Sequence, residues 1–502
     1  MLCIRLQRYF FLKKMTFISI LKLVKTLKCF HYFCSLISDM RKILNFCVLL
    51  VVLVMGPHIR LFSQSSGNLY LPKPIQEFLQ PMNWIDKGVY IVNPPEGIQL
   101  NEEDTNLMLR FEADTINIFP FYISETEITN KEYREFVYWV RDSVLRSFSA
   151  IRDNRFYSNV KKGILNFEIP LDWTQEEFRY FSKNPENEKP LTQMRTDFFN
   201  YGPFWGDNQW QIINVYPDTS VWIKEFPYGF MQTMAENYFS HPAYDNYPVV
   251  GISYNQALAF CDWKTRRLRE TFEKSGVKFP EGLTYRLPTE KEWQYAALSN
   301  FSFDFSRIYP WKGLDIRNGK EYNSNFGTIT DRNKMIIKRM EDDGSLFTTK
   351  VKSYQPNENF LYNMSGNVSE WVNPDIKAYI GLAKLFVHLN DSSMRTDSLN
   401  AVLNYLAIMY GECYINERIY DKSFILQAGK TLAKIQLILN NDYCVAKGGS
   451  WADQPLYLLP SAYAIYRTKN AVSSKTGFRI VLDTYGIPIK EEEKRKIPKQ
   501  KG

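Results

Sequence analysis

Three stretches of the chain combine a capping signal with apolar residues at helical spacing. The capping signals are TNKE at 129–132, SYNQ at 253–256 and TEKE at 289–292. In each, a hydroxyl side chain can accept from a backbone N–H of the first turn, and the Glu or Gln three residues later can reach back to the capping residue. The pattern predicts three helices that begin at these positions.

The apolar positions behind the first two caps recur with a period of about 3.6 residues, as in an amphipathic helix. In the first helix they are Tyr133, Phe136, Val137, Val140 and Val144. In the second they include Ala257, Phe260 and Cys261. Each cap also follows a short extended stretch, namely FPFYISETEI, YPVVGI or LTYRLP. We therefore expect an extended segment, a cap and a helix, three times over.

Long stretches without a regular pattern lie at 150–245 and 300–362, and they are rich in Asn, Asp, Gly, Pro and aromatic residues. Loops this long inside a compact domain are uncommon and are usually functional or held by a ligand. Residues 376–440 differ, because three successive segments there have the pattern of amphipathic helices. We expect a helical insertion, which either covers the core or offers a surface to a partner.

The N-terminus has the pattern of an export signal. From Met40, two basic residues precede an apolar run, 46–55, which is too short to span a bilayer and fits the core of a signal peptide. We assign 1–64 to a signal peptide with an over-extended start and 65–117 to an N-terminal segment. The alternative is an amphipathic membrane anchor. No Cys lies just after the apolar run, so no lipobox is visible.

The formal net charge of +8 does not indicate nucleic-acid binding. Residues 1–64 hold 10 Lys and Arg against one acidic residue, so the rest of the chain carries 52 basic and 53 acidic side chains. A basic cluster remains in 485–502, whose composition is typical of a charged flexible tail. We expect a globular protein with no nucleic-acid partner.

Cysteine and histidine are scarce beyond residue 64. The Cys residues there are Cys261, Cys413 and Cys444, and the His residues are His241 and His388. An odd number of Cys without a CxxC argues against a disulfide framework. Buried free thiols are the favoured interpretation, with a Cys413–Cys444 disulfide as the alternative. Two isolated histidines give little support to His-based catalysis or to a zinc site.

Five ordered motifs resemble formylglycine-generating-enzyme-like domains, also called the sulfatase-modifying-factor fold. They are PVVGISYNQALAFCDW, YRLPTEKEWQYAAL, NMSGNVSEWV, KGGSW and TGFRIVL, and ISETEITNKEYREF supplies the first block. The resemblance covers about 118–484. It implies an α+β fold, related to C-type lectins, with little regular secondary structure, and a domain that calcium commonly stiffens.

A narrower resemblance lies within this one. ETEITNKEYREFVYWVRDSVLR, VYPDTSVWIKEF and YFSHPAYDNYPVVGISYNQA are similar to the gliding-motility and type IX secretion ring proteins of the GldK/PorK type in Bacteroidetes. This resemblance implies a non-enzymatic periplasmic subunit at the inner face of the outer membrane. Such a subunit associates with itself, with a GldN/PorN-like ring subunit and with other type IX secretion components.

The resemblance also bears on catalysis. The oxidases of the broader family bind copper(I) through two Cys shortly after the GGS motif, since soft thiolates select that ion. At the matching positions this chain has Asp453 and Leu458, and Ser369 replaces a Trp of the pocket region. We therefore expect no formylglycine generation and no catalytic residues.

The loop NMSGNVSEWV offers oxygen ligands of the kind that calcium prefers. Asn363 can provide a side-chain oxygen and Glu370 a carboxylate, and the carbonyls of Gly366 and Val368 can join them if the chain curls. The resemblance matches these four positions to a calcium loop. The alternative is that Asn363 and Glu370 only cap a turn whose Trp371 packs in the core.

A second calcium site is implied by the same resemblance. It maps onto the Asn325 side chain and the Phe326 carbonyl, together with Asp343 and the carbonyl of Ser345. The sequence DDGS around Asp343 supports it at the expected spacing.

Other polar residues are better explained by structure than by chemistry. Arg286 and Arg479 are expected to be buried ion-pair partners rather than substrate clamps, and the cap explains Glu292. Trp139, Trp222 and Trp263 are expected in a core or an interface. One alternative function remains, a secreted ligand-binding or enzymatic member of the fold, which would need a deep pocket near Ser450 and Asp453.

Overall fold

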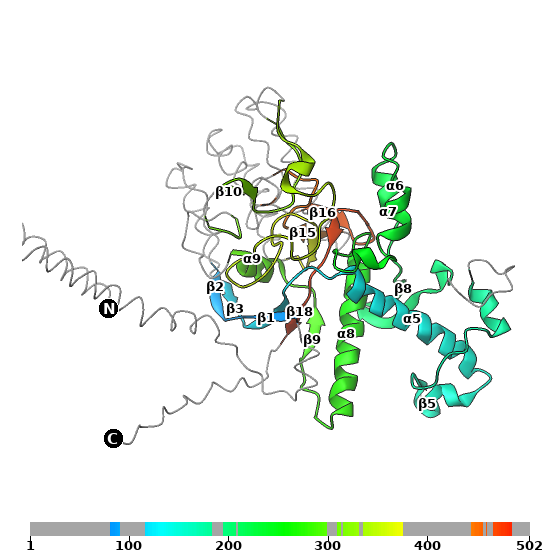
Figure 1. The fold of residues 1–502 in the computed structure, drawn as a ribbon. Coiled ribbons are helices and arrows are strands. Elements are labelled where there is room, and N and C mark those ends of the chain that lie inside the picture. The colour runs from blue at the N-terminus through cyan, green and yellow to red at the C-terminus, as the bar shows by residue number, and fades with distance from the viewer. Residues whose placement is uncertain are drawn as a thin grey trace, which may run out of the picture. The chain divides into compact units, whose positions relative to one another are not determined.

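A computed structural model gives the fold (Figure 1). The structure describes residues 81–90, 116–182, 194–206, 209–298, 309–312, 315–330, 335–374, 443–454, 458 and 465–483. All of these belong to one compact unit, Leu69–Lys490. The predicted signal peptide 1–64, helical insertion 376–440 and tail 485–502 lie outside the described residues.

The three predicted helices form with their predicted caps. They are α5 (Asn130–Ala150), α8 (Tyr254–Lys274) and α9 (Glu290–Leu298). The Thr129 and Ser253 hydroxyls accept from the backbone N–H of the third helical residue, and the Glu132 and Gln256 side chains accept from the N–H of the capping residue. Thr289 and Glu292 repeat this exchange before α9. The helices therefore begin at the predicted caps.

One antiparallel sheet joins both ends of the domain. Its strand order is β1 (Met82–Ile85), β4 (Phe121–Ser124), β18 (Val481–Asp483) and β9 (Thr284–Arg286). Strand β1 comes from the predicted N-terminal segment 65–117, so that segment contributes to the sheet. The C-terminal strand β18 lies between β4 and β9, so the sheet joins the two ends of the domain to a strand from its middle.

A second sheet contains parts of the NMSGNVSEWV and TGFRIVL motifs and leads into the KGGSW motif. Its order is β16 (Ile465–Thr468), β15 (Tyr443–Lys447), β14 (Ser369–Val372) and β17 (Thr476–Gly477). Strand β14 is the SEWV of the NMSGNVSEWV loop, and β15 leads directly into GGSW. The β14–β17 pair is parallel, and the other pairs are antiparallel. The loop at 363–370 and the GGS turn are therefore neighbours.

The remaining elements are short. The two-stranded pairs are β2 (Gly88–Tyr90) with β3 (Ile116–Ile118), β5 (Tyr157–Asn159) with β6 (Ile164–Leu165), β7 (Asn200–Gly206) with β8 (Gln209–Asn214), β10 (Arg317–Asn318) with β11 (Glu321–Tyr322), and β12 (Ile329–Thr330) with β13 (Ile336–Lys338). The short helices are α6 (Val221–Glu225), α7 (Gln232–Asn237) and the 3-10 turns Asn154–Phe156, Val160–Lys162, Glu176–Phe181, Thr196–Phe198, Pro242–Tyr244 and Met340–Asp343. This confirms the predicted α+β fold with little regular structure.

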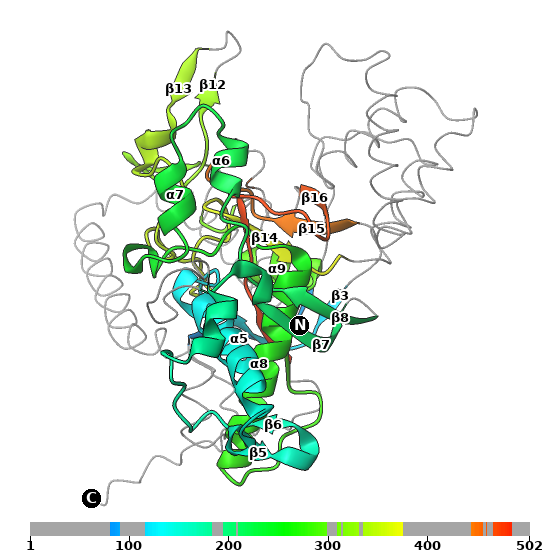
Figure 2. The ribbon, with the colours of Figure 1, turned by 90° about the vertical axis from the view of Figure 1, so that its right-hand side faces the viewer.

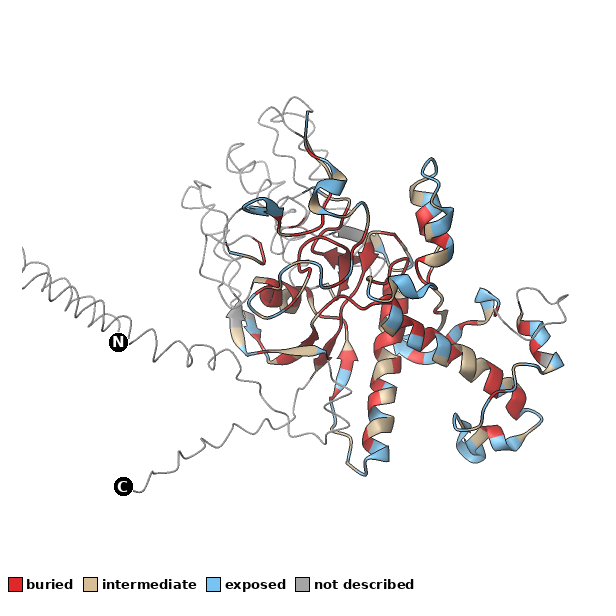
Figure 3. Ribbon diagram, in the orientation of Figure 1, coloured by how far each residue is buried: buried red, intermediate tan, exposed pale blue. Residues whose placement is uncertain are grey.

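Helices α5 and α8 lie side by side (Figure 2), and aromatic side chains fill the core between them and the strands. The Tyr133 ring of α5 stacks on the Phe260 ring of α8 with centroids 5.6 Å apart. Trp371 is fully buried, and its indole N–H donates to the Ile252 carbonyl over 2.9 Å. Buried residues concentrate on the central strands and on the loops around them (Figure 3). In the part of the chain described, no helix is both long and apolar enough for a bilayer span.

Candidate functional site

The loop before β14 curls as the calcium interpretation required. Asn363, Gly366 and Asn367 adopt positive φ angles of 52°, 80° and 61°. A side chain on Gly366 would lie 2.1 Å from the Ser324 hydroxyl oxygen and 2.3 Å from the Asn325 carbonyl oxygen, so only glycine fits. The loop is fixed on the other side by the Gly366 N–H, which donates to the Gly448 carbonyl of the GGS turn.

Glu370 is held in a buried ion pair. The Arg479 guanidinium donates to both carboxylate oxygens over 2.5 and 2.7 Å, and the Trp293 indole N–H donates over 2.6 Å. Arg479 also donates to the carbonyls of Ser124 and Tyr362. Bidentate pairs of this kind are strong and directional. The predicted structural role of Arg479 is confirmed.

Arg286 likewise serves structure. Its guanidinium donates to both carboxylate oxygens of Glu292, over 2.7 and 2.8 Å, and to Asp483 over 3.2 Å. This joins β9, the start of α9 and β18. Arg286 is an ion-pair partner as predicted, although it is half-buried rather than buried, and Glu292 takes part in the predicted cap.

A second buried carboxyl group, Glu127, lies near the ion pair of Glu370 and Arg479. Its oxygens accept from the Asn367 and Asn363 side-chain amides over 2.8 and 3.1 Å. Burial raises the pKa of Glu127 to about 8, the Glu370 carboxylate adds to this rise, and the Arg479 guanidinium opposes it. Sequence reasoning missed this residue, because nothing in ISETEI distinguishes Glu127 from the neighbouring Glu125.

Calcium at the Asn363–Glu370 loop stays a prediction. Two buried carboxyl groups lie near one guanidinium there, and the raised pKa of Glu127 keeps this group mostly protonated at neutral pH, so a further cation would favour its ionised form. Among the described residues, we find no hydrogen bond to the carbonyl oxygens of Gly366 or Val368, which leaves both as ligands. Glu370 would share its oxygens between the ion and Arg479. Asn363 would turn its side-chain oxygen toward the ion.

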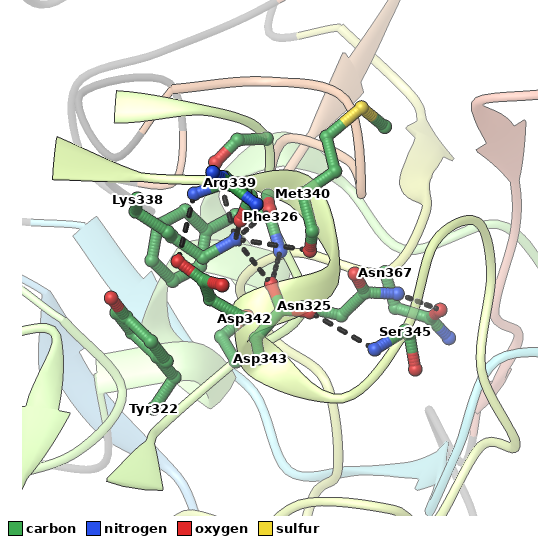
Figure 4. Close-up of polar contacts among 12 residues, drawn as sticks. Tyr322, Asn325, Phe326, Lys338, Arg339, Met340, Asp342, Asp343, Ser345 and Asn367 are labelled. Carbon is green, nitrogen blue, oxygen red and sulfur yellow. Dashed lines mark hydrogen bonds and ion pairs between the residues drawn. The ribbon is translucent and has the colours of Figure 1, made fainter. Parts of the chain in front are cut away.

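The second expected site has a different occupant. Phe326, Asp343 and Ser345 do come together, because the Asp343 carboxylate accepts from the backbone N–H of both other residues. The ammonium of Lys338, however, lies 2.8 Å from the same carboxylate and 2.7 Å from the Phe326 carbonyl (Figure 4). Burial raises the pKa of Asp343, and Lys338 opposes the rise. Two of the four predicted ligands, the Phe326 carbonyl and the Asp343 carboxylate, therefore already bind a cation of the chain itself.

The two positions that match the copper-binding thiols of the oxidases, Asp453 and Leu458, hold the local structure together. The Asp453 carboxylate closes its own turn by accepting from the backbone N–H and hydroxyl of Ser450, over 2.8 and 2.5 Å. Burial raises the pKa of Asp453. Leu458 is fully buried and packs with Tyr309, Tyr322 and Phe326. The Ser450 hydroxyl is also buried.

The family assignment rests on the comparison with known domains. Residues 81–484 match the family described as sulfatase-modifying factor enzyme 1-like domain. The chain belongs to this family. Among curated relatives, it is 33% identical over 126 residues to a formylglycine-generating enzyme of Streptomyces coelicolor, which covers 25% of this chain and 32% of that protein. It is 30% identical over 125 residues to the inactive C-alpha-formylglycine-generating enzyme 2 of Mus musculus, covering 25% and 31%.

The chain thus spans about a third of the length of these relatives. Among solved structures, CarF aligns at 15% identity with a TM-score of 0.34, covering 80% of this chain and 97% of that one. Treponema denticola variable protein 1 aligns at 13% with a TM-score of 0.33, covering 80% and 94%. The family is therefore assigned from sequence, and the activity of the whole relatives is not carried over.

Within this family member, the other candidate metal ligands stay apart. Cys261 and Cys444 are buried free thiols, as predicted, and Cys413 and His388 lie outside the described residues. His241 caps a short turn, where its Nδ1 accepts from the Ala243 N–H. No group of three or more His, Cys, Asp or Glu side chains that could hold a metal occurs within the described ranges.

Proposed function

We propose that this member of the sulfatase-modifying-factor family is a non-enzymatic structural subunit of the type IX secretion and gliding apparatus. It would form periplasmic rings with a GldN/PorN-type partner at the inner face of the outer membrane. The observation that carries the proposal is the replacement of both thiol positions by structural residues. Asp453 closes a turn and Leu458 fills a core, so neither position is free for redox chemistry.

The segment VYPDTSVWIKEF supports the narrower part of the proposal. Trp222 is buried and stacks on Trp451 of the GGSW motif with ring centroids 6.3 Å apart. The Glu225 carboxylate accepts from the backbone N–H and hydroxyl of Ser474. The segment that carries the narrower resemblance thus packs against the GGSW motif and the 473–475 segment.

An exposed apolar surface on the β7–β8 hairpin suits a partner. Trp205 and Trp210 are cross-strand neighbours whose rings meet edge to face at 5.6 Å, and Ile212 follows two residues further along β8. These three side chains are 58%, 67% and 67% exposed. The other face of β7 is buried through Tyr201 and Phe204. Large aromatic residues that the domain itself leaves uncovered are typical anchors of protein interfaces.

The same proposal includes one structural calcium ion, held by the Asn363–Glu370 loop. Its role would be to balance the Glu127 and Glu370 carboxylates and to hold irregular chain segments together, with no part in a reaction.

Affinity purification of the tagged chain from its native envelope tests the proposal. We expect a GldN/PorN-like protein to co-purify and the complex to elute as a ring-sized assembly. A chain that elutes as a monomer without such a partner would contradict the proposal. As an independent check on catalysis, the purified chain should convert no Cys-containing sulfatase peptide in the presence of copper.

A further inference from the structure

Lys338 places a positive charge where its family would lead one to expect a metal. Its ammonium is fully buried at the end of β13, together with the Asp343 carboxylate. We propose that this ammonium is a built-in cation that replaces calcium in the Asn325–Asp343 loop. The chain would therefore bind calcium at one of its two expected sites and carry its own cation at the other.

Five oxygens surround the Lys338 nitrogen. The three nearest are the Phe326 carbonyl at 2.7 Å, the Asp343 carboxylate at 2.8 Å and the Arg339 carbonyl at 2.9 Å. The carbonyls of Gly327 and Met340 follow at 3.3 Å. An ammonium has three hydrogens, so the three short contacts use all of its donors. Figure 4 shows these contacts converging on the nitrogen.

These distances suit an ammonium and not a calcium ion. Calcium binds oxygens at about 2.3–2.6 Å and takes six to eight of them, whereas N–H···O bonds measure about 2.7–3.2 Å. The charge also balances, since one ammonium faces the Asp343 carboxylate. A divalent ion in the same cage would meet the ammonium at close range and would be repelled.

Aromatic rings and the local chain hold the ammonium in place. The Phe326 ring centroid lies 4.4 Å from the nitrogen and the Tyr322 ring centroid 5.3 Å, which favours a cation. The 3-10 turn Met340–Asp343 follows directly after β13 and returns Asp343 to the lysine. The cage is thus formed mainly by a short stretch of sequence, and it needs no outside ligand to close.

One atom of the expected metal site has no partner. The Asn325 side-chain oxygen is buried and accepts no hydrogen bond from any described residue. Its amide nitrogen donates to the Phe347 carbonyl over 2.8 Å, which fixes the orientation of the side chain. The Lys338 ammonium has no hydrogen left to donate to the Asn325 oxygen. This oxygen is therefore a ligand that a metal could use once the lysine is removed.

Removal of the lysine should convert the cage into a calcium site. The experiment uses the full chain with Asn363→Ala, so that the other loop does not contribute, and measures thermal melting and terbium luminescence during calcium titration. Without a further change we expect no calcium-dependent shift. With Lys338→Ala added, we expect lower stability without calcium, a rise in Tm of several degrees with it, and terbium emission sensitised by Tyr322.

Two further variants sharpen the test. Asp343→Asn, added to Lys338→Ala, should abolish the gain, because it removes the carboxylate ligand. Lys447→Ala removes the other buried lysine and should give no calcium response. No calcium gain in a folded Lys338→Ala chain would overturn the proposal.

The unaltered cage gives a test that does not depend on the folding of Lys338→Ala. Equilibrium dialysis counts bound calcium in the parent chain and in its Asp343→Asn variant. The proposal requires the same number for both. A loss of one calcium in an Asp343→Asn chain that circular dichroism shows to be folded would mean that the metal binds beside the lysine, and it would overturn the proposal.

Discussion

Lys447, the residue before the GGS turn, is a buried lysine with a weak partner. Its ammonium is fully buried and lies 3.6 Å from the nearest Glu290 carboxylate oxygen. Burial lowers its pKa, and the Glu290 charge opposes this effect. Replacing a whole buried ion pair by apolar side chains of similar volume is often neutral or stabilising, whereas removal of one partner leaves the other uncompensated.

We therefore expect both single variants to be less stable than the parent chain. Lys447→Met and Glu290→Gln should each lower the free energy of unfolding by about 3 kcal/mol, and the double variant should be more stable than either. Urea denaturation at pH 7 measures all three. Additive losses in the double variant would mean that the two side chains do not act as a pair.

The stability of Glu290→Gln should also depend on pH in one direction. The pKa of Lys447 in the folded chain lies below its ordinary value of 10.5, so the unfolded chain binds the proton more readily in the window between the two values. Stability therefore rises with pH across that window. We expect the deficit of Glu290→Gln to shrink as the pH rises toward 10.5, while Lys447→Met, which lacks the group, serves as the control.

At the scale of single elements, the helix caps should contribute measurable stability. The Ser253 hydroxyl accepts from the Gln256 N–H at the start of α8, a helix that packs against the core through Phe260 and Leu268. Ser253→Ala should lower the free energy of unfolding by about 1 kcal/mol, and Ser253→Asp should largely retain it. Chemical denaturation of both variants measures the difference. An unchanged Ser253→Ala chain would mean that tertiary packing alone holds the helix end.

The β7–β8 hairpin is the element we expect to contact a partner. Trp205→Ser with Trp210→Ser should reduce co-purification of the GldN/PorN-like protein at least about tenfold, because the aromatic anchors of an interface carry much of its affinity. The Tm should change little, since both side chains are exposed. Leu346→Ser, an exposed apolar residue outside the hairpin, is the matched control. Undiminished assembly of the double variant would move the interface elsewhere.

At the scale of the whole molecule, the Asn363–Glu370 loop ties distant segments together. Glu127 and Arg479 meet there from opposite ends of the domain, and Gly366 contacts both the 324–325 segment and the GGS turn. A cation at this point would stabilise the whole unit rather than one loop. We expect a chelator to lower the Tm of the parent chain by several degrees and to leave Asn363→Ala almost unaffected. Differential scanning calorimetry measures this, and an unaltered parent Tm would exclude the ion.

Local signals in the sequence determined much of the architecture. The three caps, the helices behind them and the burial of Trp371 follow from residues close together in the chain, where propensity and hydrogen-bonding chemistry act over a few residues. Arg479 was also predictable as a buried partner, because its motif is apolar on both sides. The calcium loop is a prediction from sequence, and the curl of the chain at Gly366 agrees with it.

Tertiary structure decided which charges meet. Glu127 lies beside Asn363, 236 residues away, and only the folded chain raises the pKa of Glu127. Nothing in the sequence distinguishes Lys338 from the other lysines, yet at the end of β13 its ammonium lies in a cage of oxygens with Asp343. The physical reason is that the electrostatic free energy of a charged group depends on its burial and on the neighbours that folding brings close. The sequence therefore predicted the loops that could hold cations, and only the fold showed that one of them already contains its own.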